Sequence, residues 1–261
     1  MNKTFGPLSL LIFMSAYLFA GPHHKKVLNL PDGKYARIND TLYAAIYEIT
    51  NENYKAFLNA IYRDSGLSLY QKCIYDSAAW TTKFPNSYNA PLKKNYHNHR
   101  AFSIFPEVNI PWYGAMKYCE WLTAKNDILR GKEQDKLLFK LPSEKEWILI
   151  ADVDSTGFPK GLYKGKDATG KYQVNIKTMQ HDSVTIADDG GFYTVREDMY
   201  RPNRYGLYNV IGNVSEMTDT KDVEKGGNWW SAIEDCTVDK RDTFATPDPR
   251  VGFRVMLKVV K

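Results

Sequence analysis

The 261-residue sequence contains few of the side chains that bind transition metals: three cysteines (Cys73, Cys119 and Cys236) and five histidines. It has no CxxC pair and no Cys/His spacing typical of a zinc or iron–sulfur centre. In an oxidising compartment, an odd number of cysteines allows one disulfide and one free thiol, or no disulfide. Cys119 lies on an apolar helical face, so we expect it to be a buried core residue.

The chain also lacks a large excess of one charge. Its 35 basic and 30 acidic residues give a net charge of +5, and no run of five like charges occurs. A dedicated nucleic-acid-binding protein would concentrate Lys and Arg, so no nucleic-acid partner is expected. Internal repeats and regular βα alternation are absent too, which argues against a doubly wound sheet. The apolar segments are dispersed over the chain, which indicates one domain over residues 27–261.

The only long apolar run is Leu8–Phe19. It follows a positive Lys3 and is too short for a helix that spans a bilayer, which needs ~20 residues. We therefore interpret residues 1–20 as a signal peptide cleaved after Ala20, although Leu18 at the minus-three position fits the cleavage rule poorly. An uncleaved membrane anchor remains the alternative. No cysteine follows the run, which excludes lipid attachment there. The expected location is the periplasm or cell envelope, with membrane association only through partners or an uncleaved signal.

Hydrophobic periodicity and turn residues predict the first elements. Two short strands, Val27–Pro31 and Tyr35–Ile38, flank a Pro-Asp-Gly turn, and Leu42–Ile49 is apolar and β-prone. A helix should open at Thr50, with one apolar stripe on Tyr54, Phe57, Leu58 and Ile61. Asp64–Arg100 has no periodicity and is interpreted as a long surface loop.

Two more helices and two more strands are predicted further along. One helix should start at Pro111, and another after the capping box of Ser143 and Glu146. Phe105–Ile110 is predicted to be a short strand, and Arg250–Val260 a terminal strand. Its alternation places four apolar residues on one face: Val251, Phe253, Val255 and Leu257.

The segment Asn203–Lys225, followed by Gly226-Gly227-Asn228-Trp229-Trp230, combines many glycines and asparagines with aromatic residues. Such a run indicates a compact, folded loop region, because linkers are poor in aromatic residues. Trp229 and Trp230, with the aromatic segment Tyr88–Phe105, could form a ligand or partner surface, but core packing is the preferred interpretation.

Eight motifs in this order resemble the formylglycine-generating enzyme, or sulfatase-modifying factor, domain family. They are Tyr43–Asn51, Val108–Trp112, Cys119–Leu122, Leu141–Trp147, Tyr205–Asn209, Gly212–Glu216, Lys225–Trp229 and Gly252–Arg254. The resemblance covers nearly all of the chain after the signal peptide. It implies one irregular α/β (α+β) domain related to the C-type lectin fold, low in regular secondary structure, with bound calcium.

Within that family, the segment Ala187–Val195 and its continuation to Asn209 look most similar to the gliding-motility and type IX secretion lipoproteins of Bacteroidetes. Those proteins carry the domain in the periplasmic ring of a secretion machine. This chain differs from them because it is shorter and lacks the lipid-bearing cysteine.

The resemblance also implies that the family's oxidase chemistry is lost. That chemistry uses two cysteines five residues apart to bind copper, and here these positions are Ser231 and Cys236. A serine hydroxyl is a poor ligand for Cu(I), which prefers thiolates, so bound copper is not expected. The family's active-site serine is replaced by Asn228 and its tryptophan by Met217. An iron-dependent branch of the fold needs an additional helical domain, which is absent here.

Calcium is the cofactor that the resemblance implies, as one or two structural ions. One set of ligands would be the carbonyls of Ile211, Gly212 and Val214 with the carboxylate of Glu216. The other would be the side chain of Asn175, the carboxylate of Asp189, and the carbonyls of Ile176 and Gly191. Mixed carboxylate and carbonyl oxygens suit Ca²⁺. The alternative is that Asp189 and Glu216 cap turns or pair with arginine.

The sequence thus predicts a non-catalytic periplasmic scaffold or binding subunit of an envelope machine related to type IX secretion and gliding motility. Its expected partners are envelope proteins. Two alternatives stay open: an oxidase of the formylglycine-generating type with a remodelled site, and a lectin-like module that binds glycans or peptides.

Overall fold

The computed structural model describes residues 27–85, 89–130, 135–155, 157–160, 162, 164–180, 183–184, 188–244 and 247–260. The signal-peptide prediction for residues 1–20 falls outside these ranges. Within them, no helix is both long enough and apolar enough to cross a membrane.

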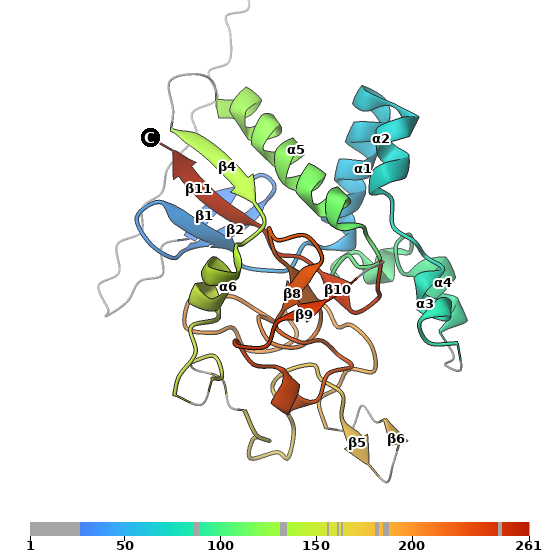
Figure 1. The fold of residues 1–261 in the computed structure, drawn as a ribbon, viewed down its shortest axis with the longest axis vertical. Helices are drawn as coiled ribbons and strands as arrows, with labels where there is room; N and C mark the ends of the chain where they lie inside the picture. The colour runs from blue at the N-terminus through green and yellow to red at the C-terminus, as the bar shows by residue number, and fades with distance from the viewer. Residues whose placement is uncertain are drawn as a thin grey trace, which may run out of the picture.

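A five-stranded antiparallel sheet in the order β1–β2–β3–β11–β4 lies on the left of the upper half of the molecule in Figure 1. Its strands are β1 Val27–Leu30, β2 Gly33–Arg37, β3 Leu42–Ala45, β4 Lys136–Lys140 and β11 Met256–Val260. The predicted hairpin around Pro31-Asp32-Gly33 is therefore confirmed. The terminal strand β11 pairs inside the sheet, between β3 from the N-terminal part of the sequence and β4 from its middle.

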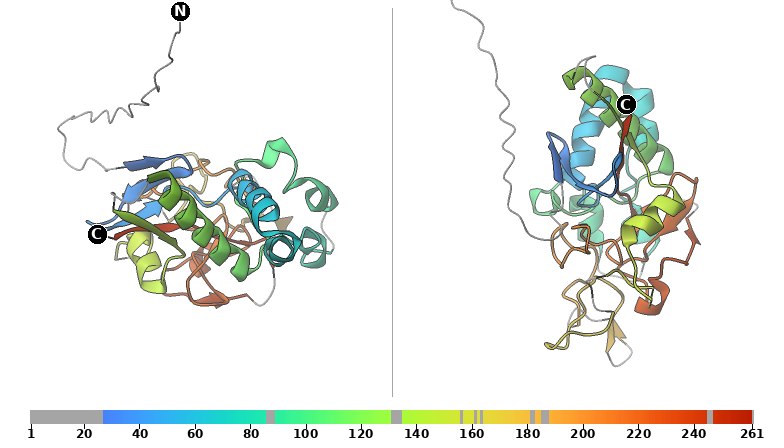
Figure 2. Two further views of the ribbon diagram at one scale, coloured as in Figure 1. Left: turned by 90° about the horizontal axis from the view of Figure 1, so that it is seen from above. Right: turned by 90° about the vertical axis from the view of Figure 1, so that its left-hand side faces the viewer.

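The period-2 alternation of these strands divides the interior into two cores. Tyr43 and Leu257 face the core that contains α1 Asn51–Ser65 and α5 Trp112–Arg130. Leu42 and Met256 face the core that contains α6 Glu144–Ala151 and the irregular loops. One face of the sheet is thus covered by helices and the other by α6 and loops (Figure 2).

The helix starts follow the local signals in the sequence. Thr50 caps α1 through a reciprocal pair of contacts with Asn53, and Ser143 caps α6 in the same way with Glu146. All four residues of the predicted α1 stripe are buried: Tyr54, Phe57, Leu58 and Ile61. The helices predicted to start at Thr50, Pro111 and Ser143 are confirmed.

The interpretation of Asp64–Arg100 as a surface loop was wrong. The segment contains the short helices α2 Leu67–Cys73, α3 Ala79–Thr82 and α4 Ala90–Asn95, and the 3₁₀ helix η1 Arg100–Phe102 follows. Cys73, Trp80 and Tyr96 are buried. Helices of four to seven residues are too short to repeat an apolar position, so periodicity could not reveal them.

Two strand predictions also need correction. Phe105–Ile110 is not a strand, since it makes only an isolated bridge between Pro106 and Thr50, and Asn109 has a left-handed backbone. The predicted terminal strand is divided into β10 Val251–Gly252 and β11, with Arg254 buried between them. Its apolar face is confirmed, because Val251, Phe253, Val255 and Leu257 all lie in the same core.

The glycine-rich region is built on a second, four-stranded sheet in the order β10–β7–β8–β9. Its strands are β7 Ser215–Met217, β8 Val223–Lys225, β9 Asp242–Thr243 and β10, and β7 pairs with β10 in parallel. A small hairpin of β5 Met179–Gln180 and β6 Ser183–Val184 lies at the lower end of the molecule (Figure 1), and the 3₁₀ helix η2 Ile233–Asp235 follows β8. All the predicted site residues lie in the part of the chain from Asn175 to Cys236.

Candidate functional site

The loop that follows β8 brings together two of the three positions at which the family's catalytic groups are replaced, Asn228 and Ser231. The backbone N–H of Asn228 donates to Ser231 Oγ at 3.1 Å. The Asn228 side chain donates to Ser215 Oγ at 2.9 Å and accepts from the N–H of Trp230 at 3.0 Å. Asn228 and Ser231 therefore act as turn-forming groups that hold this loop on β7.

Cys236 ends η2 and is fully buried. Its sulfur lies against Gly227, where any side chain would collide with it, and the thiol contacts the carbonyl of Ala232 at 3.4 Å. Burial raises the pKa of the Cys236 thiol to about 12. Cys236 is therefore an enclosed thiol, and Ser231 offers no second thiol to complete a two-thiolate copper site.

The other cysteines do not complete a metal site or a disulfide. Cys73 and Cys119 are also buried, and all three thiols are free. The structure therefore has no disulfide, which was one of the two arrangements left open. Met217, in β7, packs in the core beneath α1 and α5 and exposes no reactive surface.

The loops around Asn175 and Asp189 hold one of the two predicted sets of calcium ligands close together. Asp189 accepts the N–H of Ile176 at 3.1 Å and the N–H of Gly191 at 3.0 Å. Asn175 Oδ1 is buried without a hydrogen-bond partner, and a side chain at Gly191 would collide with it. Burial raises the pKa of Asp189.

Two features of this group fit a bound cation. The unpartnered Asn175 oxygen lacks the positive partner that buried oxygens require. No ion pair to Asp189 occurs within the residues that the structure describes, so a cation there would offset the cost of its burial. The four predicted oxygens of Asn175, Ile176, Asp189 and Gly191 fit Ca²⁺, whose ligands are carboxylate, amide and carbonyl oxygens.

The predicted calcium ligands around Glu216 have a different arrangement. Glu216 is fully buried, and its Oε1 accepts from Arg254 Nε at 2.9 Å and Nη2 at 2.7 Å. Its Oε2 accepts from Trp147 Nε1 at 2.9 Å. With a guanidinium already in contact, this carboxylate does not fit a divalent cation, so the carbonyls of Ile211, Gly212 and Val214 have no anionic partner there.

The stretch before Glu216 is instead fixed by close backbone packing. Gly212 has a φ of +76°, and a side chain there would collide with the carbonyl of Asn175. The N–H of Asn213 donates to the same carbonyl at 2.8 Å. The two predicted calcium loops thus pack directly against each other.

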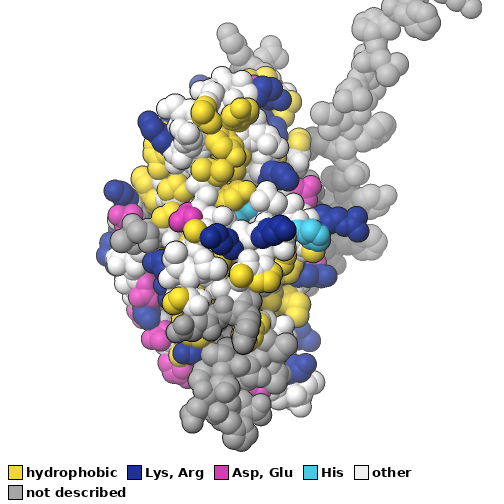
Figure 3. All heavy atoms as spheres, turned by 90° about the vertical axis from the view of Figure 1, so that its right-hand side faces the viewer, with side chains coloured by type: hydrophobic (Ala, Val, Ile, Leu, Met, Phe, Trp, Pro, Cys, Tyr) yellow, Lys and Arg dark blue, Asp and Glu magenta, His cyan; other side chains and the backbone are white. Residues whose placement is uncertain are grey.

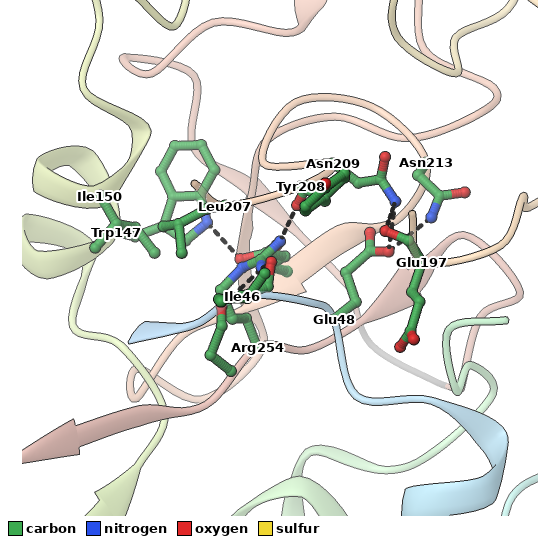
Figure 4. A network of polar contacts seen from close by, with 12 residues as sticks. Ile46, Glu48, Trp147, Ile150, Glu197, Leu207, Tyr208, Asn209, Asn213 and Arg254 are labelled. Atoms are coloured by element: carbon green, nitrogen blue, oxygen red, sulfur yellow. Dashed lines mark hydrogen bonds and ion pairs between the residues drawn. The ribbon is translucent and has the colours of Figure 1, made fainter. Parts of the chain in front are cut away.

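A buried carboxylate that sequence reasoning missed lies next to this loop (Figure 4). Glu48 Oε2 accepts from Asn213 Nδ2 at 2.7 Å and from Asn209 Nδ2 at 3.3 Å, whereas Oε1 has no partner. Burial raises the pKa of Glu48 to about 8. The signal in the sequence was a lone carboxylate within the apolar run Leu42–Ile49.

The aromatic pair belongs to a third core rather than to an exposed surface. Trp229 is 2% exposed and packs with Trp80, Phe84 and Tyr193, and Trp230 lies half-buried beside it. The preferred interpretation of Trp229 as a core residue is confirmed.

A different surface exposes apolar side chains, over α1 and α2. Tyr62 and Leu67 are 56% and 55% exposed, and the Tyr62 ring contacts that of Tyr70. Figure 3 shows hydrophobic side chains gathered on the upper part of this face, with Lys, Arg and His side chains across its middle. Large exposed apolar patches commonly mark sites of interaction.

In a comparison with protein families, residues 29–259 match the sulfatase-modifying factor enzyme 1-like domain. Similar curated proteins include the mouse formylglycine-generating enzyme, 29% identical over 58% of this chain and 33% of its own length. The enzyme of Streptomyces coelicolor is 32% identical over 42% of this chain and 31% of its own length. The bovine inactive C-alpha-formylglycine-generating enzyme 2 is 32% identical over 58% of this chain and 44% of its own length.

The chain spans about a third of the length of the curated formylglycine-generating enzymes it matches. Among solved structures, PvdO from Pseudomonas aeruginosa superposes with a TM-score of 0.57 at 17% identity, covering 87% of this chain and 81% of that one. Treponema denticola variable protein 1 gives a TM-score of 0.53 at 16% identity, covering 90% and 99%. These similarities establish the irregular α/β fold predicted from the sequence.

Proposed function

This chain belongs to the sulfatase-modifying factor enzyme 1-like domain family, and we propose that it is a non-catalytic member that acts as a scaffold or binding subunit in the cell envelope. The observation that carries the proposal is the state of the copper-ligand positions. Ser231 supplies no thiol, and the Cys236 thiol is neutral and enclosed. The exposed apolar surface of Tyr62 and Leu67 supports a role in binding. Envelope proteins, including those of a secretion or motility complex, are the proposed partners.

Copper binding tests the loss of catalysis. In an anaerobic titration against a Cu(I) chelator, the wild-type protein should take up no stoichiometric Cu(I), because one buried neutral thiol cannot form a two-thiolate site. Cys236→Ser and Cys73→Ser should both behave like the wild type. A one-to-one copper complex that is lost in Cys236→Ser and kept in Cys73→Ser would revive the oxidase alternative.

Crosslinking in intact cells tests the binding role. A tagged chain should fractionate with the periplasm or envelope and recover a stoichiometric envelope protein. Leu67→Glu should reduce that recovery, since it places a charge on the surface over α1 and α2. Ile128→Glu is the matched control, because Ile128 is an apolar side chain 83% exposed on a different helix, α5. Recovery that Leu67→Glu leaves unchanged would count against this surface.

We also propose that one structural calcium ion binds to Asn175, Ile176, Asp189 and Gly191. Calcium at about 100 times its dissociation constant should raise the free energy of unfolding by about 2.7 kcal/mol, because the ion binds only the folded chain. The measurement is thermal unfolding with calcium and with a chelator, and the chelator should lower the melting temperature.

A neighbouring carboxylate gives the control for calcium binding. Asp189→Asn should abolish the chelator effect, whereas Asp188→Asn should keep it, because Asp188 pairs with Lys166 at the surface. Equal melting of the wild type with and without chelator would contradict the proposal. If only Glu216→Gln abolished the chelator effect, the ion would bind instead at the loop that contains Gly212 and Glu216.

A further inference from the structure

A pocket of about 350 Å³ lies beside the hairpin of β1 and β2, and it shares no residue with the copper-ligand positions or the calcium loops. We call it the β1–β2 pocket. Its charged lining consists of Asp32, Lys34, Glu48 and Glu197, and its apolar lining includes Pro31, Tyr35 and Ile49. Asp32 is already paired with Lys125. The pocket therefore combines the carboxylates of Glu48 and Glu197 with the ammonium of Lys34 and an apolar wall.

Glu48 is the deepest of these groups, with 1% of its surface exposed. Asn209 and Asn213 satisfy only Oε2, and Oε1 has no hydrogen-bond partner (Figure 4). Among the described residues, no Lys, Arg or His lies within ion-pair distance of Glu48. A buried carboxylate oxygen without a partner is costly, so the site is incomplete without a donor or a cation.

Glu197 adds negative charge at the rim. It is partly buried, and burial, followed by the neighbouring Asp198, raises its pKa to about 7, while Lys34 acts in the opposite direction. Figure 4 shows the backbone of Glu197 beside Asn209 and its carboxylate directed away from Glu48. The two carboxylates thus line different parts of the pocket and do not converge on one point.

We propose that the β1–β2 pocket binds an organic ammonium group, which donates to Glu48 Oε1 while its alkyl stem lies in the apolar part of the pocket. An ammonium has three donors and no acceptor, which suits an unpartnered carboxylate oxygen. The volume far exceeds that of a bare ion, and it accommodates a chain of several methylenes.

A divalent metal ion fits this pocket less well. Calcium needs six to eight oxygens, whereas Glu48 presents one unpartnered carboxylate oxygen and Glu197 points elsewhere. Within the described residues, no group of three or more His, Cys, Asp or Glu side chains is placed to hold a metal. The ammonium can come from a free alkylamine or from a lysine side chain of a partner protein.

The experiment is an amide-shift NMR titration of the full folded domain with butylammonium, and with butanol as the neutral control. Butylammonium should produce saturable shifts at Gly33 and Lys34, and butanol should not. Two peptides, acetyl-Gly-Lys-Gly-amide and its norleucine counterpart, make the same comparison for a protein partner. Tighter binding of the lysine peptide than of butylammonium would indicate a partner's side chain, and the reverse order a free amine.

Three glutamate variants locate the ammonium. Glu48→Gln should weaken butylammonium binding by about tenfold or more, because a charge-assisted hydrogen bond is lost. Glu197→Gln, at the rim, should weaken it by a smaller factor. Glu224→Gln is the matched control: Glu224 is also buried, has an unpartnered Oε2 and a pKa raised to about 7, but lies outside the pocket. Its affinity should equal that of the wild type.

Binding should also depend on pH. Burial raises the pKa of Glu48 to about 8, so the carboxyl is protonated below that pH and an ammonium must displace the proton. The affinity for butylammonium should therefore rise about tenfold per pH unit from about pH 6 to about pH 8. The charged groups that act on Glu48 are Arg254 and Glu216, and those that share the pocket with it are Asp32, Lys34 and Glu197.

Several outcomes would overturn the proposal: no saturable shift with either ammonium ligand, equal binding of butanol, or unchanged affinity in a Glu48→Gln protein that keeps the wild-type spectrum. Calcium alone competing at Gly33 and Lys34 would make it a metal site instead. If Glu48→Gln fails to fold, Glu197→Gln decides, since unchanged affinity there also contradicts it. None of these outcomes depends on the copper or crosslinking experiments, because the pocket shares no residue with their sites.

Discussion

Arg254→Met should lower the free energy of unfolding by about 3–5 kcal/mol, since it leaves the fully buried Glu216 carboxylate without its cation. Arg254→Met would also remove hydrogen bonds to three backbone carbonyls. Arg254 Nη1 donates to the carbonyls of Ala45 at 2.9 Å and Ile46 at 2.8 Å, and Nη2 donates to that of Tyr208 at 2.6 Å. One side chain therefore joins β3, the loop around Tyr208 and β7. Urea unfolding followed by far-UV circular dichroism measures the change.

Arg250→Met is the control that separates the effect of burial on stability from the effect of losing a positive charge. Arg250 pairs with Asp248 in a similar two-bond contact, but its side chain is 36% exposed, and Lys83 Nζ stays 3.5 Å from the buried Asp248 carboxylate. Arg250→Met should therefore cost less than Arg254→Met, about 1–2 kcal/mol. Removing the Glu216 charge as well, in Arg254→Met/Glu216→Leu, should recover part of the stability that the single variant loses. Equal effects of Arg254→Met and Arg250→Met would show that the buried pair does not determine stability.

The ion pair of Glu216 and Arg254 could not be predicted from the sequence. Glu216 and Arg254 are 38 positions apart, and no local pattern pairs them. The helix starts at Thr50 and Ser143 could be predicted because each capping contact spans three residues. The carboxylate was therefore assigned to calcium by resemblance, whereas its actual partner depends on the parallel pairing of β7 with β10, the strand just before Arg254.

Burial of the third core was predictable only in part. Tryptophan is highly buried on average, which favoured a core position for Trp229. Its partners Trp80 and Phe84 belong to the segment interpreted as a surface loop, because that segment's helices are too short to show periodicity. Glu48 was missed although it is a lone carboxylate in an apolar run, because its partners Asn209 and Asn213 are more than 160 positions away.

Trp229→Ala should lower the free energy of unfolding by about 3–5 kcal/mol, the range for removing a buried aromatic side chain from a packed core. The Trp229 ring lies 5.1 Å from that of Phe84 and 5.2 Å from that of Tyr193. Its Nε1 donates to the carbonyl of Pro249 at 3.1 Å. The substitution would leave a cavity between α3, the loop after β8 and the segment before β10, and it would leave that carbonyl without a donor.

Trp230→Ala is the matched control, because the same side chain next in sequence is only half-buried. Its main polar contact is with Lys177, whose Nζ lies 4.4 Å from the ring, so the expected loss is about 1 kcal/mol. Denaturant unfolding and a glycan array on both variants distinguish a core from a lectin-like surface. A core role requires the large loss in Trp229→Ala alone. Stable variants that lose glycan binding would instead assign the pair to recognition, since an exposed aromatic contributes to ligand contact and little to folding.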